Sequence, residues 1–313
     1  MRQAVRRIRR RPLPGAIHSS CHGPTGASRG SALAVGGRFG GVHLAGRRAV
    51  ATAGERMNNP LCGARMKSPD KLAVVTGGTK GIGLEFSRRL TRMGYRVVAT
   101  FRSDEDSANR AAQEMKKGLS VIQSDVSDPD EVARLADLVR TGHGTPQVLV
   151  NNAGLNIDRP VLEISDMDWR RVLDTNLSGP FYMTRAFAPH MLEAGGGSIV
   201  NIGATTAIRP RLNGANYCSS KAGLLHLTKC LAMELAPSIR VNCLIPGMID
   251  TEEMRTRFRL AEPEHMNSLL DEIPQRRIGS TDEMADALEF LVSAGATYVT
   301  GQKLIVDGGQ FMW

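Results

Sequence analysis

From about residue 70 to the C-terminus, short apolar runs alternate with longer segments whose apolar residues recur at helical spacing. The apolar runs are typical of strands buried on both faces, and they cover 71–78, 95–101, 119–126, 147–154, 197–203, 239–247 and 303–309. Helical periodicity predicts helices over 82–93, 103–118, 128–142, 166–194, 214–236 and 281–294. Strands and helices that alternate in this way predict a doubly wound parallel sheet with helices on both faces. We therefore expect a single α/β domain over 70–313, without an internal repeat or a second core.

Single residues mark some of these boundaries. Gly94 suits the left-handed position that ends the first helix, and Ser103 or Asp104 suits the cap that begins the second helix. On the long helix before the sixth apolar run, His226 is interpreted as a packed side chain without a chemical role, and Met233 as part of the core or the lining of a pocket.

The positive charge of the chain is concentrated in its first 65 residues. Of 40 basic and 31 acidic residues, this segment holds twelve arginines and one acid, Glu55, which leaves 28 basic and 30 acidic residues for 66–313. The net charge of +9 therefore falls to −2 over the folded part. A nearly neutral domain argues against a nucleic-acid-binding surface.

The N-terminal segment 1–65 also has a distinctive composition. An Arg-rich, acid-poor start with Val5 and Ile8 on one helical face is typical of a mitochondrial presequence. The alternative is a start codon assigned too far upstream, with Met57 or Met66 as the true start of a cytoplasmic protein. Because Gly and Pro are dense up to residue 64, we expect 1–65 to be a disordered extension in either case.

The cysteines show no metal-ligand spacing and are odd in number, which indicates reduced thiols rather than a disulfide framework. They are Cys21, Cys62, Cys218, Cys230 and Cys243. No apolar run approaches the roughly 20 residues that a membrane-spanning helix requires. We expect neither a metal site nor a membrane span.

A glycine-rich segment, TGGTKGIG over 76–83, stands where the first predicted strand becomes the first helix. Glycines at this point allow the backbone to approach a pyrophosphate closely at the helix N-terminus. The position inside a β-α-β unit indicates a dinucleotide-binding loop rather than an ordinary turn. The spacing of Gly77, Gly81 and Gly83 is wider than that of the common fingerprint.

Motifs in matching order and spacing make the chain resemble the short-chain dehydrogenase/reductase family over about 70–313. Residues 76–83 match its TGxxxGxG motif, Asn151-Asn152-Ala153-Gly154 match NNAG, Asn176 lies in a matching DTNLSGPF, Tyr217 and Lys221 form YxxxK, and Pro246-Gly247 begin the PG motif. The resemblance implies a Rossmann-type domain, a nicotinamide cofactor and a homotetramer.

Two cations indicate which nicotinamide cofactor is used. At the end of the second strand an acid would hold the ribose 2′-OH of NAD, whereas a basic residue accommodates a 2′-phosphate. Arg102 occupies this position, no acid appears before Asp104, and Lys80 in the glycine loop is a second cation. We therefore predict NADP(H). The resemblance implies that its further binding residues are Gly77, Thr79, Gly81, Ile82, Gly83, Asp125, Val126, Asn152, Ala153, Gly154, Pro246, Gly247, Ile249 and Thr251, with Tyr217 and Lys221.

Tyr217 and Lys221 are the candidate catalytic pair. Residues four apart on a helix lie on one face, so an ammonium can sit beside the phenol and favour its phenolate. Such a phenol can protonate a carbonyl oxygen as hydride arrives. By resemblance, Lys221 also holds the nicotinamide ribose, and Asn176 ties a water to it.

One expected hydroxyl is missing. The family has a serine or threonine thirteen residues before the tyrosine, where this chain has Ala204, which offers no donor. Either Thr205 takes its place, which requires a loop one residue shorter, or the enzyme works with three of the four residues. Loss of one donor to an oxyanion typically lowers a rate by about 10²–10³.

The sequence thus predicts an NADPH-dependent reductase that converts a ketone to a secondary alcohol. The segments TFRSDEDSANRA, GSIVNIGATT and GQKLIVDGG resemble the 3-oxoacyl-thioester reductase branch, so the expected substrate is a small carbonyl compound carried on acyl carrier protein or coenzyme A. The alternatives are an alcohol, sugar or steroid dehydrogenase, and a catalytically silent NADP-binding protein.

Overall fold

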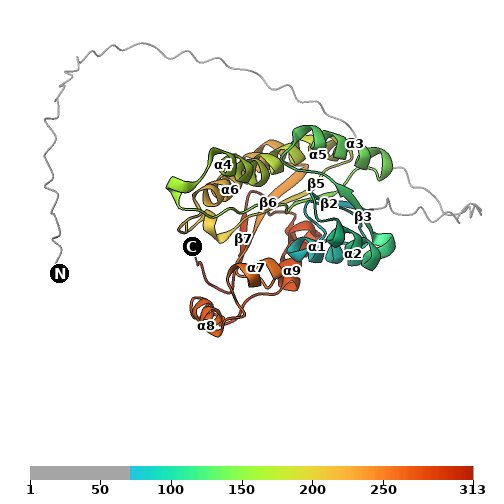
Figure 1. Ribbon diagram of the computed structural model, residues 1–313. Helices are drawn as coiled ribbons and strands as arrows, with labels where there is room; N and C mark the ends of the chain where they lie inside the picture. The colour runs from blue at the N-terminus through green and yellow to red at the C-terminus, as the bar shows by residue number, and fades with distance from the viewer. Residues whose placement is uncertain (1–70, 313) are drawn as a thin grey trace, which may run out of the picture. The chain divides into compact units, whose positions relative to one another are not determined.

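The computed structural model of the protein describes residues 71–312 (Figure 1). The predicted extension 1–65, with its presequence or misassigned start, lies outside the described residues. Within the described part, no helix is both long enough and apolar enough to cross a membrane.

The strands form one parallel sheet of seven in the order β3-β2-β1-β4-β5-β6-β7. Their bounds are β1 Leu72–Val75, β2 Arg96–Phe101, β3 Leu119–Gln123, β4 Val148–Asn151, β5 Gly197–Ile202, β6 Ile239–Pro246 and β7 Lys303–Val306. The order reverses between β1 and β4, which is the point at which open parallel sheets bind ligands at their carboxyl ends. The predicted doubly wound α/β fold is confirmed.

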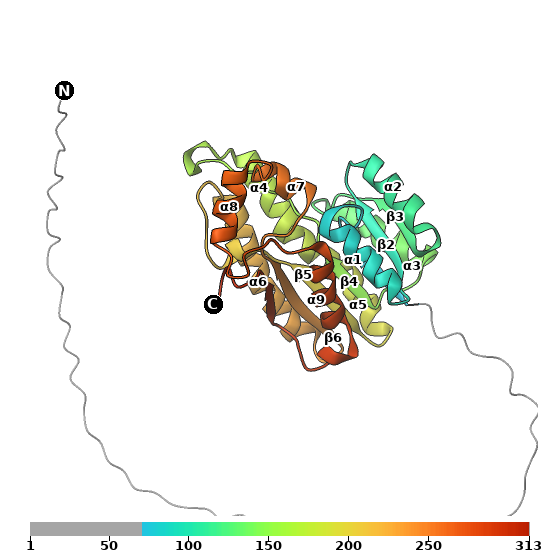
Figure 2. The same cartoon turned by 90° about the horizontal axis from the view of Figure 1, so that it is seen from below.

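Helices cover both faces of this sheet (Figures 1 and 2). Their bounds are α1 Gly81–Arg92, α2 Glu105–Met115, α3 Pro129–Gly142, α4 Asp166–Leu173, α5 Gly179–Glu193, α6 Ala215–Leu235, α7 Glu252–Arg257, α8 Pro263–Asp271 and α9 Thr281–Val292. One apolar cluster joins α3, α5 and α6 to the sheet, and a second joins α1, α2 and α9 to its other face. Because the strands are apolar on both sides, each face has its own core.

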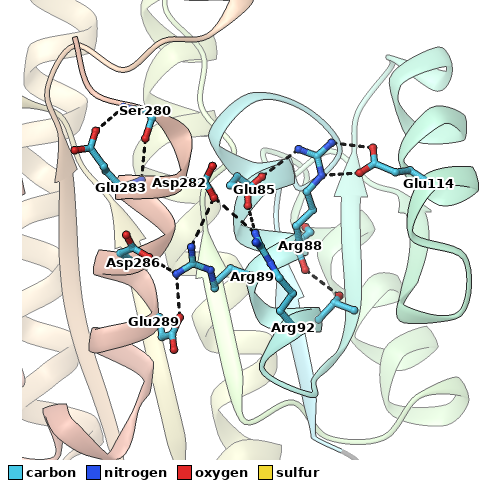
Figure 3. Close-up of polar contacts among 12 residues, drawn as sticks. Glu85, Arg88, Arg89, Arg92, Glu114, Ser280, Asp282, Glu283, Asp286 and Glu289 are labelled. Carbon is cyan, nitrogen blue, oxygen red and sulfur yellow. Dashed lines mark hydrogen bonds and ion pairs between the residues drawn. The ribbon is translucent and has the colours of Figure 1, made fainter. Parts of the chain in front are cut away.

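An ion-pair network fixes α1 between α2 and α9 (Figure 3). Arg88 forms a bidentate pair with Glu114 of α2, with N–O distances of 2.7 and 2.8 Å. Arg89, whose side chain is 14% exposed, contacts Asp286 and lies 2.9 Å from Glu289, both on α9. Solvent screens the Arg89 guanidinium less than its partners, because the side chains of Asp286 and Glu289 are 67% and 46% exposed. The helix that follows the glycine loop is therefore held from both sides.

The structure differs from the sequence predictions in several places. The helix expected over 166–194 is interrupted by a π-helical turn, Asp174–Ser178, and the two helices α7 and α8 were not expected. His226 and Met233 were interpreted as packed, which is wrong, because both are exposed. Asp104, one of the two caps considered for α2, is the residue that accepts a hydrogen bond from Ser107 N.

Candidate active site

The glycine loop joins β1 to α1 at the carboxyl edge of the sheet. Gly77 and Gly81 have φ of +60° and +53°, which is the left-handed region that favours glycine. A Cβ on Gly83 would lie 2.2 Å from the carbonyl oxygen of Gly77 and 2.5 Å from Nδ2 of Asn152. The first turn of α1 therefore packs directly on the loop, without room for a side chain.

Asn152 holds this loop to the end of β4. Its Nδ2 donates to the carbonyl oxygens of Thr76 and Gly77, at 2.9 and 3.0 Å. In return, Oγ1 of Thr76 accepts the backbone N–H groups of Asn152 and Ala153, both at 2.9 Å. In this structure the side chain of Asn152 shapes the loop that was predicted to bind the cofactor.

The other predicted loop residues differ in accessibility. Thr79 and Gly83 are buried and Ile82 is half-buried, whereas Lys80 and Gly81 are exposed. Nζ of Lys80 lies 2.8 Å from Oδ2 of Asp104. This hydrogen bond, aided by the backbone N–H of Ser107, lowers the pKa of Asp104 to about 2.

Arg102 lies at the end of β2, and its side chain is exposed. It borders a cavity of about 430 Å³, whose other lining residues are Asp125, Ser127, Arg171, Asp174 and Thr175. No acidic side chain within 71–312 pairs with Arg102, whereas Lys80 is paired with Asp104. Arg102 is therefore the predicted cofactor cation whose charge is available to an anion. Val126, predicted beside Asp125, is buried against Gly179.

Tyr217 and Lys221 lie one turn apart on α6, with Nζ of Lys221 5.8 Å from the centroid of the Tyr217 ring. Burial lowers the pKa of Lys221 to about 8 and raises the pKa of Tyr217 to about 12. The Lys221 ammonium donates to the carbonyl oxygen of Ile202 at 2.8 Å. At neutral pH the pair thus consists of a protonated phenol and a charged lysine.

Asn176 reaches the same place from the π-helical turn. Its Oδ1 accepts from Leu155 N at 2.7 Å, and its Nδ2 donates to Leu155 O at 2.8 Å and to Oγ of Ser220 at 3.0 Å. A Cβ on Gly154 would lie 3.5 Å from Oδ1 of Asn176 and 3.8 Å from Nζ of Lys221. Gly154 is exposed, so Asn176 and Lys221 lie beside a backbone that carries no side chain.

In the loop after β5, Ala204 and Thr205 differ in backbone conformation and in burial. Ala204 is extended and half-buried, and Thr205 begins a short 3₁₀ turn, Thr205–Ala207, with 9% of its surface exposed. Within this loop, Oγ1 of Thr206 is buried and has no hydrogen-bond partner among residues 71–312. Sequence reasoning did not single out Thr206, although a threonine next to a missing serine is a visible signal.

The segment after β6 completes the edge of the site. Gly247 N donates to Val306 O at 2.9 Å, which ties the PG turn begun by Pro246 to β7. Ile249 is buried, and Thr251 caps α7 by accepting from Met254 N at 3.2 Å. A Cβ on Gly81 would lie 3.8 Å from the methyl group of Thr251. The glycine loop and the start of α7 therefore face each other.

Two arginines that the sequence did not single out as catalytic lie beside the tyrosine. The guanidinium carbon of Arg211 is 5.4 Å from the centroid of the Tyr217 ring. Arg211 and Arg257 of α7 both pair with Asp158.

Among residues 71–312, no group of His, Cys, Asp and Glu side chains could hold a metal ion.

Known proteins match the chain over nearly all of its described part. The family model described as enoyl-(acyl carrier protein) reductase matches residues 77–310. The 3-oxoacyl-[acyl-carrier-protein] reductase of Staphylococcus epidermidis is 34% identical over 247 residues, which are 78% of this chain and 100% of the relative. The 3β-hydroxysteroid dehydrogenase 1 of Eggerthella lenta is 38% identical over 248 residues, 78% of this chain and 94% of the relative.

A solved structure agrees with these relatives. The gluconate 5-dehydrogenase of Burkholderia cenocepacia, in complex with NADP and tartrate, has a TM-score of 0.72 and 31% identity, and the match covers 79% of this chain and 97% of that one. The sheet order, the glycine loop and these matches agree with one another. The chain belongs to the short-chain dehydrogenase/reductase family and is an oxidoreductase that acts on CH–OH or C=O groups.

Proposed function

We propose that this protein reduces a ketone to a secondary alcohol with NADPH, and that Tyr217 is the proton donor. The observation that carries the proposal is the meeting of Tyr217, Lys221 and Asn176 next to the open backbone of Gly154. A bound nicotinamide would supply the hydride. Tyr217, protonated at neutral pH because burial raises its pKa to about 12, would donate a proton to the carbonyl oxygen.

The other two side chains would orient and polarise the reacting groups. Lys221 is buried with its ammonium at Ile202 O, so it is a fixed positive charge below its lowered pKa of about 8. Such a charge favours a phenolate over a phenol. Asn176, locked by Leu155 and Ser220, would keep that end of the site rigid.

NADP(H) is proposed on the charges at the end of β2. Arg102 is exposed beside the cavity that Asp125 also lines, and a guanidinium is well suited to a 2′-phosphate. The paired Lys80 and Asp104 add no net charge there. The solved structure of the Burkholderia cenocepacia relative in complex with NADP is consistent with this choice.

For the substrate, we propose a 3-oxoacyl thioester on acyl carrier protein or coenzyme A, as the name of the Staphylococcus epidermidis relative suggests. A hydroxysteroid or a sugar acid is the second candidate, because the Eggerthella lenta and Burkholderia cenocepacia relatives carry those names. A homotetramer is proposed on the family resemblance alone.

The test follows NADPH oxidation optically with three substrates: a 3-oxoacyl thioester, a 3-oxosteroid and a keto sugar acid. Tyr217→Phe should lower turnover by orders of magnitude while NADPH still binds, because only the proton donor is lost. Tyr298→Phe, at a fully exposed tyrosine, is the matched control and should leave turnover unchanged. Full turnover in Tyr217→Phe would refute the assignment. NADPH binding without turnover of any substrate would favour a silent binding protein instead.

The location of the protein is a separate proposal. We propose that residues 1–65 direct it to the mitochondrial matrix, because the segment is rich in arginine and contains one acid. A fusion of 1–65 to a fluorescent protein should enter mitochondria. A fusion that stays in the cytoplasm would favour a start at Met57 or Met66.

A further inference from the structure

A second cation, besides Lys221, lies against the candidate proton donor. The Arg211 guanidinium carbon is 5.4 Å from the centroid of the Tyr217 ring, slightly closer than Nζ of Lys221 at 5.8 Å. A guanidinium over an aromatic ring is attracted by the electrons of the ring, and it stabilises a phenolate more than a neutral phenol.

Several contacts hold Arg211 in this position. Its Nη1 and Nη2 each donate to a carboxylate oxygen of Asp158 at 2.8 Å, and Nη2 also donates to Oδ1 of Asn156 at 2.7 Å. A Cβ on Gly214 would lie 3.2 Å from Cγ and Nε of Arg211. The guanidinium is thus clamped between the Asp158 loop and the start of α6.

This placement has an energetic cost. Nε of Arg211 is buried and has no hydrogen-bond partner among residues 71–312, and a buried donor left without a partner destabilises the folded state. Such groups call for a specific explanation in a native structure. A role at the adjacent phenol supplies one.

Charged groups face Tyr217 from several elements. Burial raises the pKa of Tyr217, Arg211 and Arg257 lower it, and Glu253 of α7 and the neighbouring Cys218 raise it. The side chains of Arg211 and Arg257 are only 28% and 27% exposed, so solvent screens them incompletely. The two guanidinium groups share the one carboxylate of Asp158, and their effect on the Tyr217 pKa is larger than that of Glu253.

We propose that Arg211 is a positioning residue that acts through Tyr217, and that its clamped positive charge stabilises the phenolate left when the phenol gives its proton to the carbonyl oxygen. The charge thereby offsets part of the stabilisation that the absent hydroxyl at Ala204 would have provided. This role rests on the proposed function, in which Tyr217 is the donor. It would explain how a site with alanine in the serine position retains its activity.

The first test measures the phenol directly and needs no turnover. The chain has four tyrosines, so carbon-13 at their ζ carbons gives few NMR signals, and Tyr217→Phe identifies the one of interest. With NADP⁺ present, the signal is followed from about pH 9 to about pH 12.5 in the wild type, Arg211→Gln and Arg211→Lys, so that the wild-type midpoint, expected near 12, falls inside the range.

A unit charge at about 6 Å, in an effective dielectric constant of about 20–40, shifts a pKa by about one to two units, and Asp158 cancels part of this effect. Arg211→Gln should therefore raise the pKa midpoint of Tyr217 by about one unit. Arg211→Lys should raise this midpoint by less, because lysine keeps the positive charge. Arg209→Gln removes the same charge from an exposed position on the same loop and should leave the midpoint unchanged. If the Tyr217 signal titrates at the same pH in the wild type and in Arg211→Gln, or titrates in neither, the proposal is wrong.

The second test uses the oxidation of the product alcohol. Arg211→Gln should lower kcat about tenfold near neutral pH, leave KM unchanged and move the alkaline rise of kcat to higher pH. Ala204→Ser should raise kcat more in the Arg211→Gln variant than in the wild type. If KM for anionic substrates rises instead and the pH profile stays, Arg211 binds the substrate and the proposal is wrong. If no substrate turns over, the proposed function fails while the NMR titration still decides the role of Arg211.

Discussion

Gly83→Ala tests the contact between the first turn of α1 and the glycine loop. The added Cβ would lie 2.2 Å from the Gly77 carbonyl oxygen and 2.5 Å from Nδ2 of Asn152. Neither neighbour is the free end of a flexible side chain, because Nδ2 donates to the carbonyl oxygens of Thr76 and Gly77. The loop backbone therefore has to move by several tenths of an ångström or more.

The expected change in the free energy of unfolding combines two destabilising terms and one stabilising term. Overpacking in a tight contact costs about 1–3 kcal/mol, and a lost hydrogen bond from Asn152 costs about 1 kcal/mol. Alanine is about 1 kcal/mol more favourable than glycine within a helix. The free energy of unfolding should thus fall by about 1–3 kcal/mol, and a fall of about 2 kcal/mol would lower Tm by about 4–8 °C.

Thermal unfolding and NADPH fluorescence titration measure the two consequences. Gly142→Ala is the matched control, because that glycine ends α3 and a Cβ there would meet no atom within 4 Å. It should leave Tm unchanged or raise it slightly. If the loop binds the cofactor pyrophosphate, the dissociation constant for NADPH should rise about tenfold or more in Gly83→Ala. Wild-type Tm and wild-type NADPH affinity in Gly83→Ala would refute the reasoning.

Three further predictions concern the cofactor, the missing hydroxyl and acid stability. Arg102→Asp should weaken NADPH binding much more than NADH binding, since it places a negative charge at a phosphate; equal changes in the two dissociation constants would contradict the NADP assignment. Thr205→Val should lower kcat by about 10²–10³ if its hydroxyl replaces the serine, whereas a silent Thr205→Val, with a gain in Ala204→Ser, would show that the site works without that hydroxyl. Thr206→Val tests the unpaired hydroxyl next to it, with the same kcat assay. The hydrogen bond from Arg277, with help from Ser280 N, lowers the pKa of Glu283 from 4.5 to about 2. The resulting stabilisation of the folded state is complete above the unfolded pKa and is lost as the pH falls toward 2. The free energy of unfolding of Glu283→Gln, measured in urea, should therefore depend less on pH in that range.

The order of strands and helices could be predicted because most strands are apolar runs buried on both faces and helices such as α1 and α3 are clearly amphipathic. The first helix, expected over 82–93, is observed as Gly81–Arg92, and the strand expected over 95–101 as Arg96–Phe101. These features are local, and their physical cause lies within a few residues of the chain. The π-helical turn at 174–178 was missed, because an i→i+5 turn has no distinct hydrophobic pattern.

In the candidate site, too, local features could be predicted from the sequence, whereas contacts between distant segments could not. The sequence placed Tyr217 and Lys221 on one helical face, and the structure brings them to the same place. The sequence could not reveal that Arg211 lies on the Tyr217 ring, because this position depends on Asp158, which is 53 residues away. Likewise, pairing of Lys80 with Asp104 follows only from the spatial meeting of the glycine loop and α2.

The π-helical turn has a consequence for any attempt to stabilise this protein. A π-helical turn contains one residue more than a regular α-helical turn, and each residue of an α-helix advances the direction of side chains by about 100°. Deleting one residue from 174–178 would change the register between α4 and α5, and Pro180, now in the first turn of α5, would come to lie inside a longer helix, where proline is unfavourable. The same deletion would rotate Asn176 away from Leu155 and Ser220, to which it is bonded. The extra residue of this turn therefore serves two requirements at once: it keeps Pro180 at the start of a helix, and it keeps Asn176 in contact with Leu155 and Ser220.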